Sequence, residues 1–390
     1  MRNLKIAFFS HDAELYGASR SLVTLVKGLM LKGVECILII PYKGPLLELV
    51  TNHDIKYSIL AYPSWLYKRG SRKDAGGIKR VGRFLYRSLR VLFDKKNVDL
   101  LNSYDLIVTN TSAIPIGILF AFRMKKLHVW HIRELAELHY GTSYILGRSL
   151  FFYLIGKSRF RLFNSYFVMN YYEKNLSSKA TSLVLYNGVY TREEFDIFFD
   201  LYKSRRSIND TPFIFCIIGY IHEGKGQFQA VDAIGEIVQN NKAIRLLVVG
   251  NGETKALQNY IDKKGLSEYI TLTGYVQDIG TILLKSNCLL NCAKYEAFGR
   301  TTVEAMAYSL PVIGRNSAGT AEILVHNKTG LLYDGSTKDL VKCMNMLIDN
   351  PVLGRAIGKN GWEDARRKYN ESDYVEKFWQ FIREAVASGK

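Results

Sequence analysis

The sequence predicts an α/β protein with two Rossmann-like domains, and three observations support this fold class. The chain has 390 residues, more than a single hydrophobic core usually holds, so two domains are expected. Short apolar runs alternate with helical patterns in both halves, which is typical of parallel sheets joined by crossover helices. A loop containing small residues follows the first apolar run of each half, where α/β folds bind ligands.

The strands of the first domain are predicted from continuous apolar runs, which suit strands buried on both faces of a parallel sheet. These runs lie at residues 4–10, 35–40, 56–60, 106–109 and 127–132. A turn with Gly17 and Ser19 follows the first run and leads into a helix expected at 20–32. This turn can contact a ligand through the helix N-terminus, or Ser19 can act only as a helix cap.

The second domain is expected to begin at Pro212, with strands at residues 213–218, 246–250, 270–275, 288–291 and 311–314. Residues 191–210 are charged and are expected to hold a short helix and then the linker. Residues 339–390 have the pattern of two or three amphipathic helices. We therefore expect domains at 1–205 and 206–372, followed by a last helix at 373–390.

The net charge of +17 is unevenly distributed, since residues 67–96 contain eleven Lys or Arg and two Asp. On a helical wheel, residues 78–92 place an apolar stripe opposite five basic residues. The stripe is Ile78, Val81, Leu85, Leu89 and Leu92, and the basic residues are Lys79, Arg80, Arg83, Arg87 and Arg90. Such a helix suits an anionic membrane surface, although a stripe packed on the sheet explains the same pattern.

A second basic segment, residues 143–163, interleaves Arg148, Lys157, Arg159 and Arg161 with aromatic residues and contains no acid. This mixture also favours a membrane interface. Aromatic residues among basic ones can instead stack nucleic-acid bases, but no nucleic-acid motif accompanies them, so no nucleic acid is expected as a partner.

The remaining composition favours a cytoplasmic protein at the inner face of the cell membrane. The five cysteines are scattered, and no further Cys or His pair joins Cys288 and Cys292, which argues against zinc and for reduced thiols. The N-terminus has no signal-peptide pattern, and no apolar run approaches the ~20 residues of a membrane-spanning helix.

The clearest candidate site lies in residues 293–314, where Glu296 is predicted in a loop before a helix that starts near Thr301 or Thr302. Phe298 and Gly299 form the turn, and Gly299 lets the backbone and the free helix amides approach an anion. Glu304 follows about one turn into the helix, where its carboxylate can accept hydrogen bonds from sugar hydroxyls. The pattern predicts a site for a phosphorylated sugar, whereas the simpler alternative is two surface glutamates.

A glycine-rich loop at residues 219–227 follows the first strand of the second domain. Its glycines, which include Gly219 and Gly226, let the backbone wrap a phosphate, while Lys225 supplies a positive charge. An exposed lysine in a turn is the alternative.

The segment with Glu296 and Glu304 resembles the Glu-x7-Glu signature of glycosyltransferase family 4, which comprises retaining nucleotide-sugar transferases with the GT-B fold. This resemblance implies two Rossmann-like domains that face each other across a cleft, with the C-terminal helix crossing back to the first domain. It also implies that Glu296 holds the donor sugar, that Glu304 binds the ribose, and that the amides of Phe298 and Gly299 face the sugar and diphosphate.

The resemblance extends to loops of the second domain. Lys225 and Gly226 match the Lys-Gly pair that binds the diphosphate, whereas Tyr220 stands where the family has Arg, a missing charge that Arg300 could partly supply. The donor-binding residues that it implies are Glu304, Phe298, Gly299, Arg300, Gly219, Gly226, Gly252, Tyr275, Thr301 and Gly17.

His131 ends a predicted strand of the first domain, where α/β sheets place ligand contacts. The family has a His here that lines the donor or acceptor sugar, so the catalytic candidates are Glu296, Lys225 and His131. Arg133 and Glu134 follow as acceptor-side candidates. A lone His is often merely structural.

We expect a retaining glycosyltransferase that moves a hexose-type sugar from a nucleotide-diphosphate donor to a saccharide acceptor. The basic surface suggests a lipid-linked acceptor, and the expected role is cell-surface polysaccharide assembly. No cofactor and no metal are expected, since no Asp-x-Asp triplet is present. One alternative is a non-catalytic nucleotide-sugar binding or regulatory protein, because Tyr220 lacks the charge of the family's Arg. The other is a nucleic-acid-binding protein, which leaves Glu296 unexplained.

Overall fold

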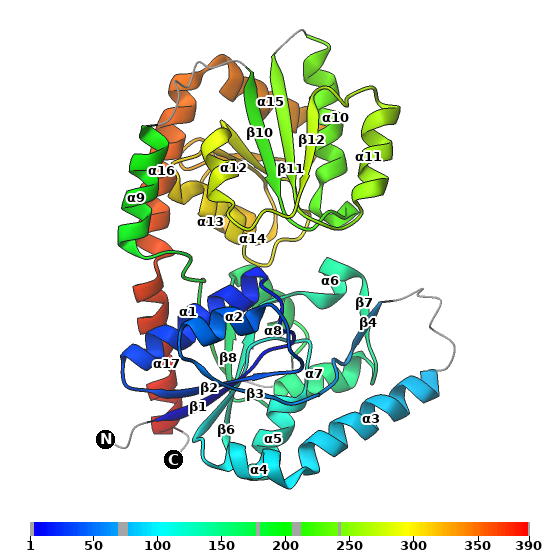
Figure 1. Cartoon of the computed structure of the whole chain (residues 1–390), viewed down its shortest axis with the longest axis vertical. Helices are drawn as coiled ribbons and strands as arrows, with labels where there is room; N and C mark the ends of the chain where they lie inside the picture. The colour runs from blue at the N-terminus through cyan, green and yellow to red at the C-terminus, as the bar shows by residue number, and fades with distance from the viewer. Residues whose placement is uncertain (1–3, 69–76, 177–179, 205–211, 241–242, 389–390) are drawn as a thin grey trace. The chain divides into compact units, whose positions relative to one another are not determined.

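The computed structural model describes residues 4–68, 77–176, 180–204, 212–240 and 243–388, and the chain divides into two compact α/β units (Figure 1). Unit 1 comprises Met1–Gly188 and Glu371–Lys390, and unit 2 comprises Val189–Asn370.

Unit 1 is built on a parallel sheet in the order β3-β2-β1-β5-β6-β8-β9. Its strands are β1 (Lys5–Phe9), β2 (Glu35–Ile40), β3 (Lys56–Ile59), β5 (Leu106–Thr109), β6 (Leu127–Ile132), β8 (Phe160–Phe163) and β9 (Thr181–Val184). A separate antiparallel pair joins β4 (Leu66–Lys68) and β7 (Thr142–Tyr144). The apolar runs of the sequence form the central strands because both faces of this sheet are covered by helices.

The helices of unit 1 cover two apolar cores, one on each face of the sheet. They are α1 (Gly17–Leu31), α2 (Leu46–Asn52), α3 (Gly77–Phe93), α4 (Lys95–Asn102), α5 (Ile116–Met124), α6 (Ala136–Tyr140), α7 (Arg148–Gly156), α8 (Tyr166–Glu173) and α17 (Glu371–Ser388).

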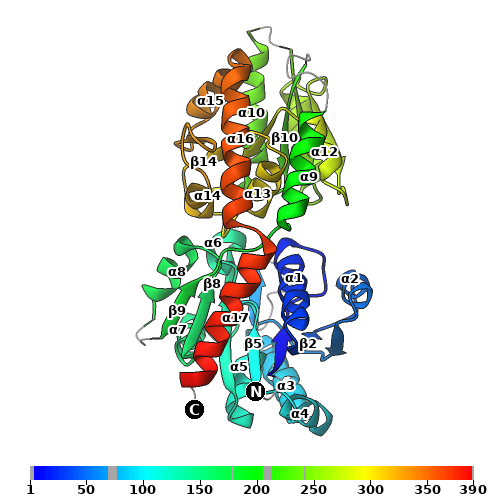
Figure 2. The same cartoon turned by 90° about the vertical axis from the view of Figure 1, so that its left-hand side faces the viewer.

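The last helix, α17, belongs to unit 1, which confirms the predicted return of the C-terminal helix. It lies beside α1 (Figure 2), and the Phe378 ring packs 6.0 Å from that of Phe8 on β1. Thr24 donates a hydrogen bond to Glu371, and Lys32 pairs with Glu376 at 2.6 Å. Apolar burial and these polar contacts together hold the helix on the sheet.

Unit 2 repeats the architecture with a parallel sheet in the order β12-β11-β10-β13-β14-β15. Its strands are β10 (Phe213–Ile218), β11 (Ile244–Val249), β12 (Ile270–Gly274), β13 (Cys288–Asn291), β14 (Val312–Arg315) and β15 (Leu331–Tyr333). Its helices are α9 (Arg192–Lys203), the 3-10 turn η1 (Glu223–Lys225), α10 (Gln227–Val238), α11 (Thr254–Lys263), α12 (Gly280–Lys285), α13 (Arg300–Ala307), α14 (Ala318–Ile323), α15 (Thr337–Asp349) and α16 (Pro351–Lys368).

The boundary between the units differs from the predicted one, since unit 1 ends at Gly188 rather than at residue 205 and resumes at Glu371 rather than at 373. The reason is α9, which packs on α16. Trp362 Nε1 donates to the Phe195 carbonyl at 2.8 Å, and Arg366 pairs with Asp196 at 2.7 Å. Residues 205–211, where the boundary was predicted, lie outside the described residues.

Candidate active site

Loops of unit 2 meet at the carboxyl edge of its sheet, because all the paired strands run parallel. Backbone hydrogen bonds join these loops directly to one another. The bonds are Gly219 N to Val249 O, Ile221 N to Asn251 O, Gly250 N to Gly274 O, Lys294 N to Gly224 O, and Gly319 N to Glu296 O, at 2.7 to 3.2 Å. The loops that contain the predicted site residues of unit 2 therefore form one continuous edge, as the topology of such folds requires.

Two glycines make the close approach of these loops possible. Gly226 has φ +79°, and a Cβ there would lie 2.5 Å from Cys292 Cβ. Gly252 has φ +133°, and a Cβ there would lie 2.4 Å from the Ile221 carbonyl oxygen. Both positions need a left-handed backbone without a side chain, so glycine is a structural requirement of this edge.

Lys225 and Glu296 form an ion pair at this edge, with 2.6 Å between Nζ and Oε2. Lys225 ends the 3-10 turn η1, and Nδ1 of His222 caps this turn by accepting from Gly224 N at 3.1 Å. The side chains of Lys225 and Glu296 remain 28% and 17% exposed, so a ligand can reach both. The structure thus brings these two candidate catalytic residues together.

The turn before α13 brings the second acidic residue to the same edge. Gly299 caps the helix with φ +98°, and α13 begins at Arg300, just before the predicted start near Thr301 or Thr302. Arg300 Nε donates to Glu304 Oε1 at 2.8 Å, and its NH2 donates to the Val189 carbonyl at 3.2 Å. Arg300 thus adds a positive charge beside Glu304.

Aromatic residues at this edge have contrasting environments. Phe298 is buried, and its ring packs edge-on at 5.6 Å from Tyr369, so it fixes the turn. Tyr275 follows β12 and has an exposed ring, which can stack on a flat ligand. Tyr220, which follows Gly219, is exposed as well and carries no charge.

His131 lies in the interior of unit 1, contrary to the prediction that it contacts a sugar. Its side chain is fully buried, with the ring 6.4 Å from Phe378 of α17. Burial and the nearby Arg133 charge hold the pKa of His131 well below its usual value, so the ring is neutral. The side chain reaches the strand end, as predicted, but α17 covers it.

Arg133 is buried too and works as an anchor rather than as an exposed acceptor contact. Its guanidinium donates to Asn110 at 2.7 Å, to Asn187, to Tyr374 OH at 2.5 Å and to His131 Nδ1 at 3.3 Å. These partners come from separate segments of unit 1, so Arg133 ties them together.

Glu134 and Gly17 lie nearer the surface of unit 1. Glu134 Oε1 accepts from Thr111 Oγ1 and Ser112 N, both at 2.5 Å, while the side chain stays partly exposed. Gly17 is the first residue of α1, and Tyr16 is the N-cap. Ser19 does not cap this helix, because its hydroxyl donates to Asp12 instead.

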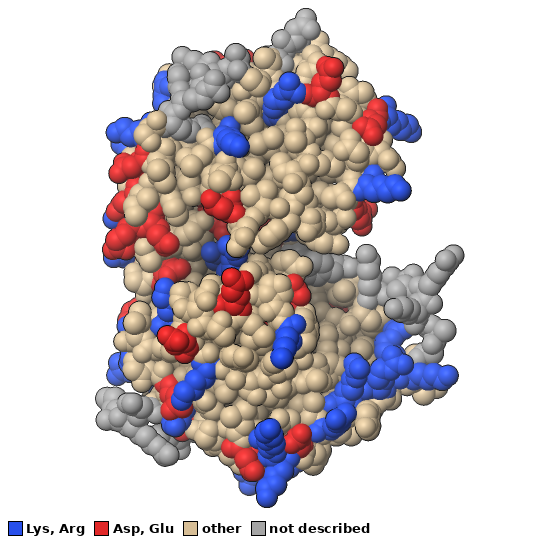
Figure 3. Space-filling view, in the orientation of Figure 1, with Lys and Arg blue, Asp and Glu red and all other residues tan. Residues whose placement is uncertain are grey.

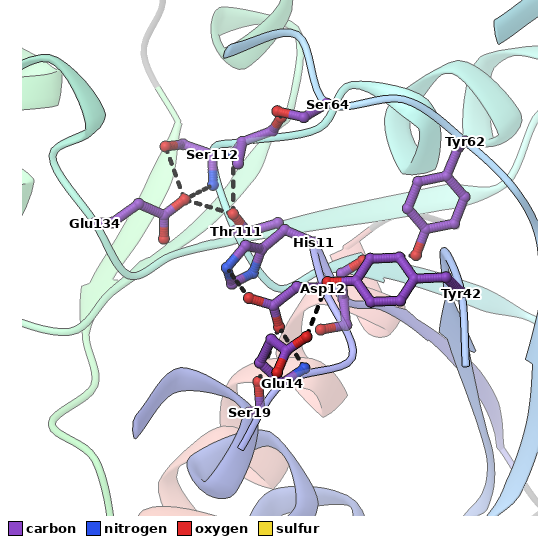
Figure 4. Close-up of polar contacts among 12 residues, drawn as sticks. His11, Asp12, Glu14, Ser19, Tyr42, Tyr62, Ser64, Thr111, Ser112 and Glu134 are labelled. Atoms are coloured by element: carbon purple, nitrogen blue, oxygen red, sulfur yellow. Dashed lines mark hydrogen bonds and ion pairs between the residues drawn. The ribbon is translucent and has the colours of Figure 1, made fainter. Parts of the chain in front are cut away.

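His11 and Asp12, which directly follow β1, were missed by the sequence reasoning. His11 Nε2 and Asp12 Oδ2 lie 2.8 Å apart, and Asp12 Oδ1 accepts from Glu14 N and Ser19 Oγ, both at 3.3 Å (Figure 4). Burial alone favours the neutral ring, but the hydrogen bond that His11 donates to Asp12 and the charges of Asp12 and Glu134 raise the pKa of His11. Their place after the first strand was the available signal, the same signal that selected His131.

Comparison with known proteins gives a family and a fold. Residues 199–364 match the family model described as glycosyl transferases group 1. An uncharacterized glycosyltransferase of Methanocaldococcus jannaschii is 27% identical over 352 residues, which cover 84% of this chain and 91% of that protein. The capsular polysaccharide biosynthesis glycosyltransferase CapM of Staphylococcus aureus is 28% identical over 180 residues, 43% of this chain and 45% of CapM.

Among solved structures, Anabaena HepE in complex with UDP-glucose matches with a TM-score of 0.78 at 18% identity. The match covers 98% of this chain and 100% of HepE. At this identity the likeness shows a shared fold.

Proposed function

Because this chain is a glycosyltransferase of the family 4 type with the GT-B fold, we propose that it moves a hexose-type sugar from a nucleotide-diphosphate donor to a saccharide acceptor, with retention of anomeric configuration. The observation that carries the proposal is the Lys225–Glu296 ion pair, which lies at the same loop edge as Gly299 and Glu304. A cation, a helix N-terminus and two carboxylates at one edge suit a phosphorylated sugar.

Each group has a role in this proposal. The bond between the anomeric carbon and the diphosphate oxygen breaks, and negative charge develops on the leaving diphosphate. Lys225, the amides before α13 and Arg300 stabilise that charge without a metal ion. Glu296 and Glu304 accept hydrogen bonds from the hydroxyls of the sugar and the ribose, and so position the donor.

We propose a uridine diphosphate sugar as the donor. HepE, with the same fold, was solved with UDP-glucose. The exposed ring of Tyr275 at the end of β12 is suited to stacking on a base.

Measurement of UDP release from a panel of UDP-sugars tests the transferase proposal. Lys225→Met should lower kcat by about 10²–10³-fold, because it removes a donor aimed at the developing charge. Lys263→Met, on the exposed side of α11, is the control and should leave UDP release unchanged. If Lys225→Met releases UDP as fast as the wild type, the proposed role of this loop edge in catalysis is excluded.

The acceptor part of the proposal depends on α3. This helix packs on α4 and α5 through Phe84, Ser88 and Val91. The predicted apolar stripe does not face the sheet: Ile78, Leu85 and Leu89 are 90%, 42% and 52% exposed. The packing alternative for the stripe is therefore wrong for these three residues.

Basic residues flank this exposed stripe. Lys79, Arg83, Arg87 and Arg90 are all exposed, and Figure 3 shows Lys and Arg side chains gathered over the part of unit 1 that α3 forms. Apolar and cationic groups side by side on one helix suit an anionic membrane surface. Residues 69–76 of the basic stretch lie outside the described residues.

We therefore propose a lipid-linked saccharide acceptor, with the protein bound peripherally to the inner face of the cell membrane. In the part of the chain that the structure describes, no helix combines the length and apolarity needed to cross a bilayer. The CapM relative supports a role in cell-surface polysaccharide assembly.

A further inference from the structure

The position of Lys225 depends on a turn that has no apolar anchor of its own. The turn η1 spans three residues, Glu223–Lys225, and none of them is buried. Gly224 lies inside the turn and Gly226 follows it, and glycine gives the backbone more freedom than other residues do. Such a short 3-10 turn keeps its shape through hydrogen bonds, so the groups that supply these bonds determine where the Lys225 amine lies.

His222 supplies two of these hydrogen bonds. Its side-chain Nδ1 accepts from Gly224 N at 3.1 Å, and its carbonyl accepts from Lys225 N at 2.9 Å. Its backbone is extended, with φ −162° and ψ 161°, as is typical of a residue that caps a helical turn. Because Nδ1 acts as an acceptor, it carries no proton, and the neutral ring has its proton on Nε2.

The residue before His222 is fixed to the neighbouring loop of unit 2. Ile221 is fully buried, its N–H donates to the Asn251 carbonyl at 2.7 Å, and its carbonyl accepts from Glu253 N at 2.9 Å. His222 therefore extends from a rigid point of the loop edge. Its side-chain cap joins η1 to that point.

Gly224 links the capped turn to the loop that contains Glu296. Its N–H is bound by His222, and its carbonyl accepts from Lys294 N at 3.2 Å. Lys225 is the next residue along the chain, Glu296 lies two residues after Lys294, and the two side chains pair at 2.6 Å. The His222 cap is thus part of a short series of contacts that ends at the ion pair of the proposed donor site.

We infer that His222 is a positioning residue for the proposed transfer, because its Nδ1 cap holds η1 in the shape that directs Lys225 toward Glu296. His222 acts through Lys225, and the inference requires no contact between His222 and the donor. Without the cap, Gly224 N loses its acceptor and the Lys225 amine is less well oriented toward the charge that develops on the leaving diphosphate. This inference rests on the proposed glycosyl transfer.

UDP release by the full chain tests this inference, with UDP-glucose as the donor and octyl glucoside as the acceptor probe. His222→Ala removes the side-chain acceptor and keeps the carbonyl, so kcat should fall by about 10-fold through the misplaced amine. In a Lys225→Met background the same change should have little further effect, because no amine is left to position. A general defect of the fold would lower kcat by the same factor in both backgrounds.

Two further variants separate the cap from the mere loss of a side chain. His222→Asn should keep kcat within about 2-fold of the wild type, because the side-chain oxygen of Asn also caps helical turns. His326→Ala is the matched control, since His326 Nδ1 also accepts a backbone N–H, that of Leu332, at 3.0 Å. His326 lies in the turn before β15, at the amino edge of the same parallel sheet, so its replacement should leave kcat unchanged.

The outcomes distinguish this inference from the proposed function. A wild-type kcat in His222→Ala, an equal loss in both backgrounds, or a His222→Asn variant as slow as His222→Ala overturns the inference, while a slow Lys225→Met variant still supports the transfer. If the wild type releases no UDP, or if Lys225→Met is as fast as the wild type, the proposed function is contradicted and the inference with it.

Discussion

At the scale of single residues, two ion pairs define the proposed donor site, Lys225 with Glu296 and Arg300 with Glu304. Each pair holds a cation beside a carboxylate. A bound diphosphate competes for the cations, while sugar hydroxyls satisfy the carboxylates. The two pairs thus compensate the charges at this edge.

The closeness of Glu296, Gly299 and Glu304 could be predicted from the sequence because it is local. Glu296, Gly299 and Glu304 lie within one loop and the helix that follows it. His131 and Arg133 could not be placed in this way, since their burial depends on α17, and the Arg133–Tyr374 contact spans 241 positions of the chain. A pattern that marks a strand end does not reveal what covers it.

Buried His128 makes the stability of the protein depend on pH. Burial lowers the pKa of His128 to about 3 in the folded protein, against ~6.5 in an unfolded chain. The neutral buried ring therefore stabilises the protein fully above the pKa of His128 in the unfolded chain. This contribution is lost as the pH falls from that pKa toward the pKa in the folded protein. Between pH 7.5 and 5.5 the wild type should lose about 1 kcal/mol more unfolding free energy than His128→Gln.

Urea unfolding at the two pH values measures this difference, with tryptophan fluorescence as the signal, since the Trp130 ring lies 5.3 Å from His128. His53→Gln is the matched control and should behave as the wild type. Equal losses in the wild type and in His128→Gln would show that His128 does not resist protonation.

At the scale of elements, the apolar runs predicted the central strands of both sheets well. β2, β5, β6, β10 and β13 have the predicted bounds, because strands covered on both faces are mostly apolar. The short strands β4, β7 and β15 were not predicted, since three residues give too little pattern. The helical period of α3 was correct, but period alone does not tell which face is covered.

The exposed stripe of α3 predicts binding to acidic vesicles. Leu85→Ser with Leu89→Ser should weaken binding through lost apolar burial. Arg83→Gln with Arg87→Gln should weaken it by about 2 kcal/mol, roughly 30-fold, through lost charge. Cosedimentation with vesicles of phosphatidylglycerol and phosphatidylcholine, at low salt, measures both effects.

Lys255→Gln with Lys263→Gln on α11 removes the same charge from unit 2 and is the control. It should bind like the wild type. If the wild type fails to sediment with acidic vesicles, or if the α11 control loses as much binding as the α3 variants, the membrane-facing role of α3 is excluded.

At the scale of the whole molecule, chain length correctly indicated two α/β units, and the last helix returns to unit 1 as predicted. The boundary was misplaced because α9 is charged and amphipathic like a linker helix, whereas its packing on α16 assigns it to unit 2. Arg133 links two distant segments of unit 1, since it donates hydrogen bonds to both Asn187 and Tyr374. These residues lie close to the points where unit 1 ends and resumes.

The chain has a net charge of +17, and basic residues of the two units have different proposed roles. Lys225 and Arg300 in unit 2 are assigned to the donor, and the basic residues of α3 in unit 1 to lipid.

The central claim is that the loop edge of unit 2 binds a nucleoside diphosphate, and calorimetric titration of the full chain with UDP tests it most directly. The wild type should bind one UDP, and Glu304→Ala should bind it about 10-fold or more weakly, because a hydrogen bond to a charged group contributes about 1.5–3 kcal/mol. No binding by the wild type, or equal affinity in Glu304→Ala, would contradict the account.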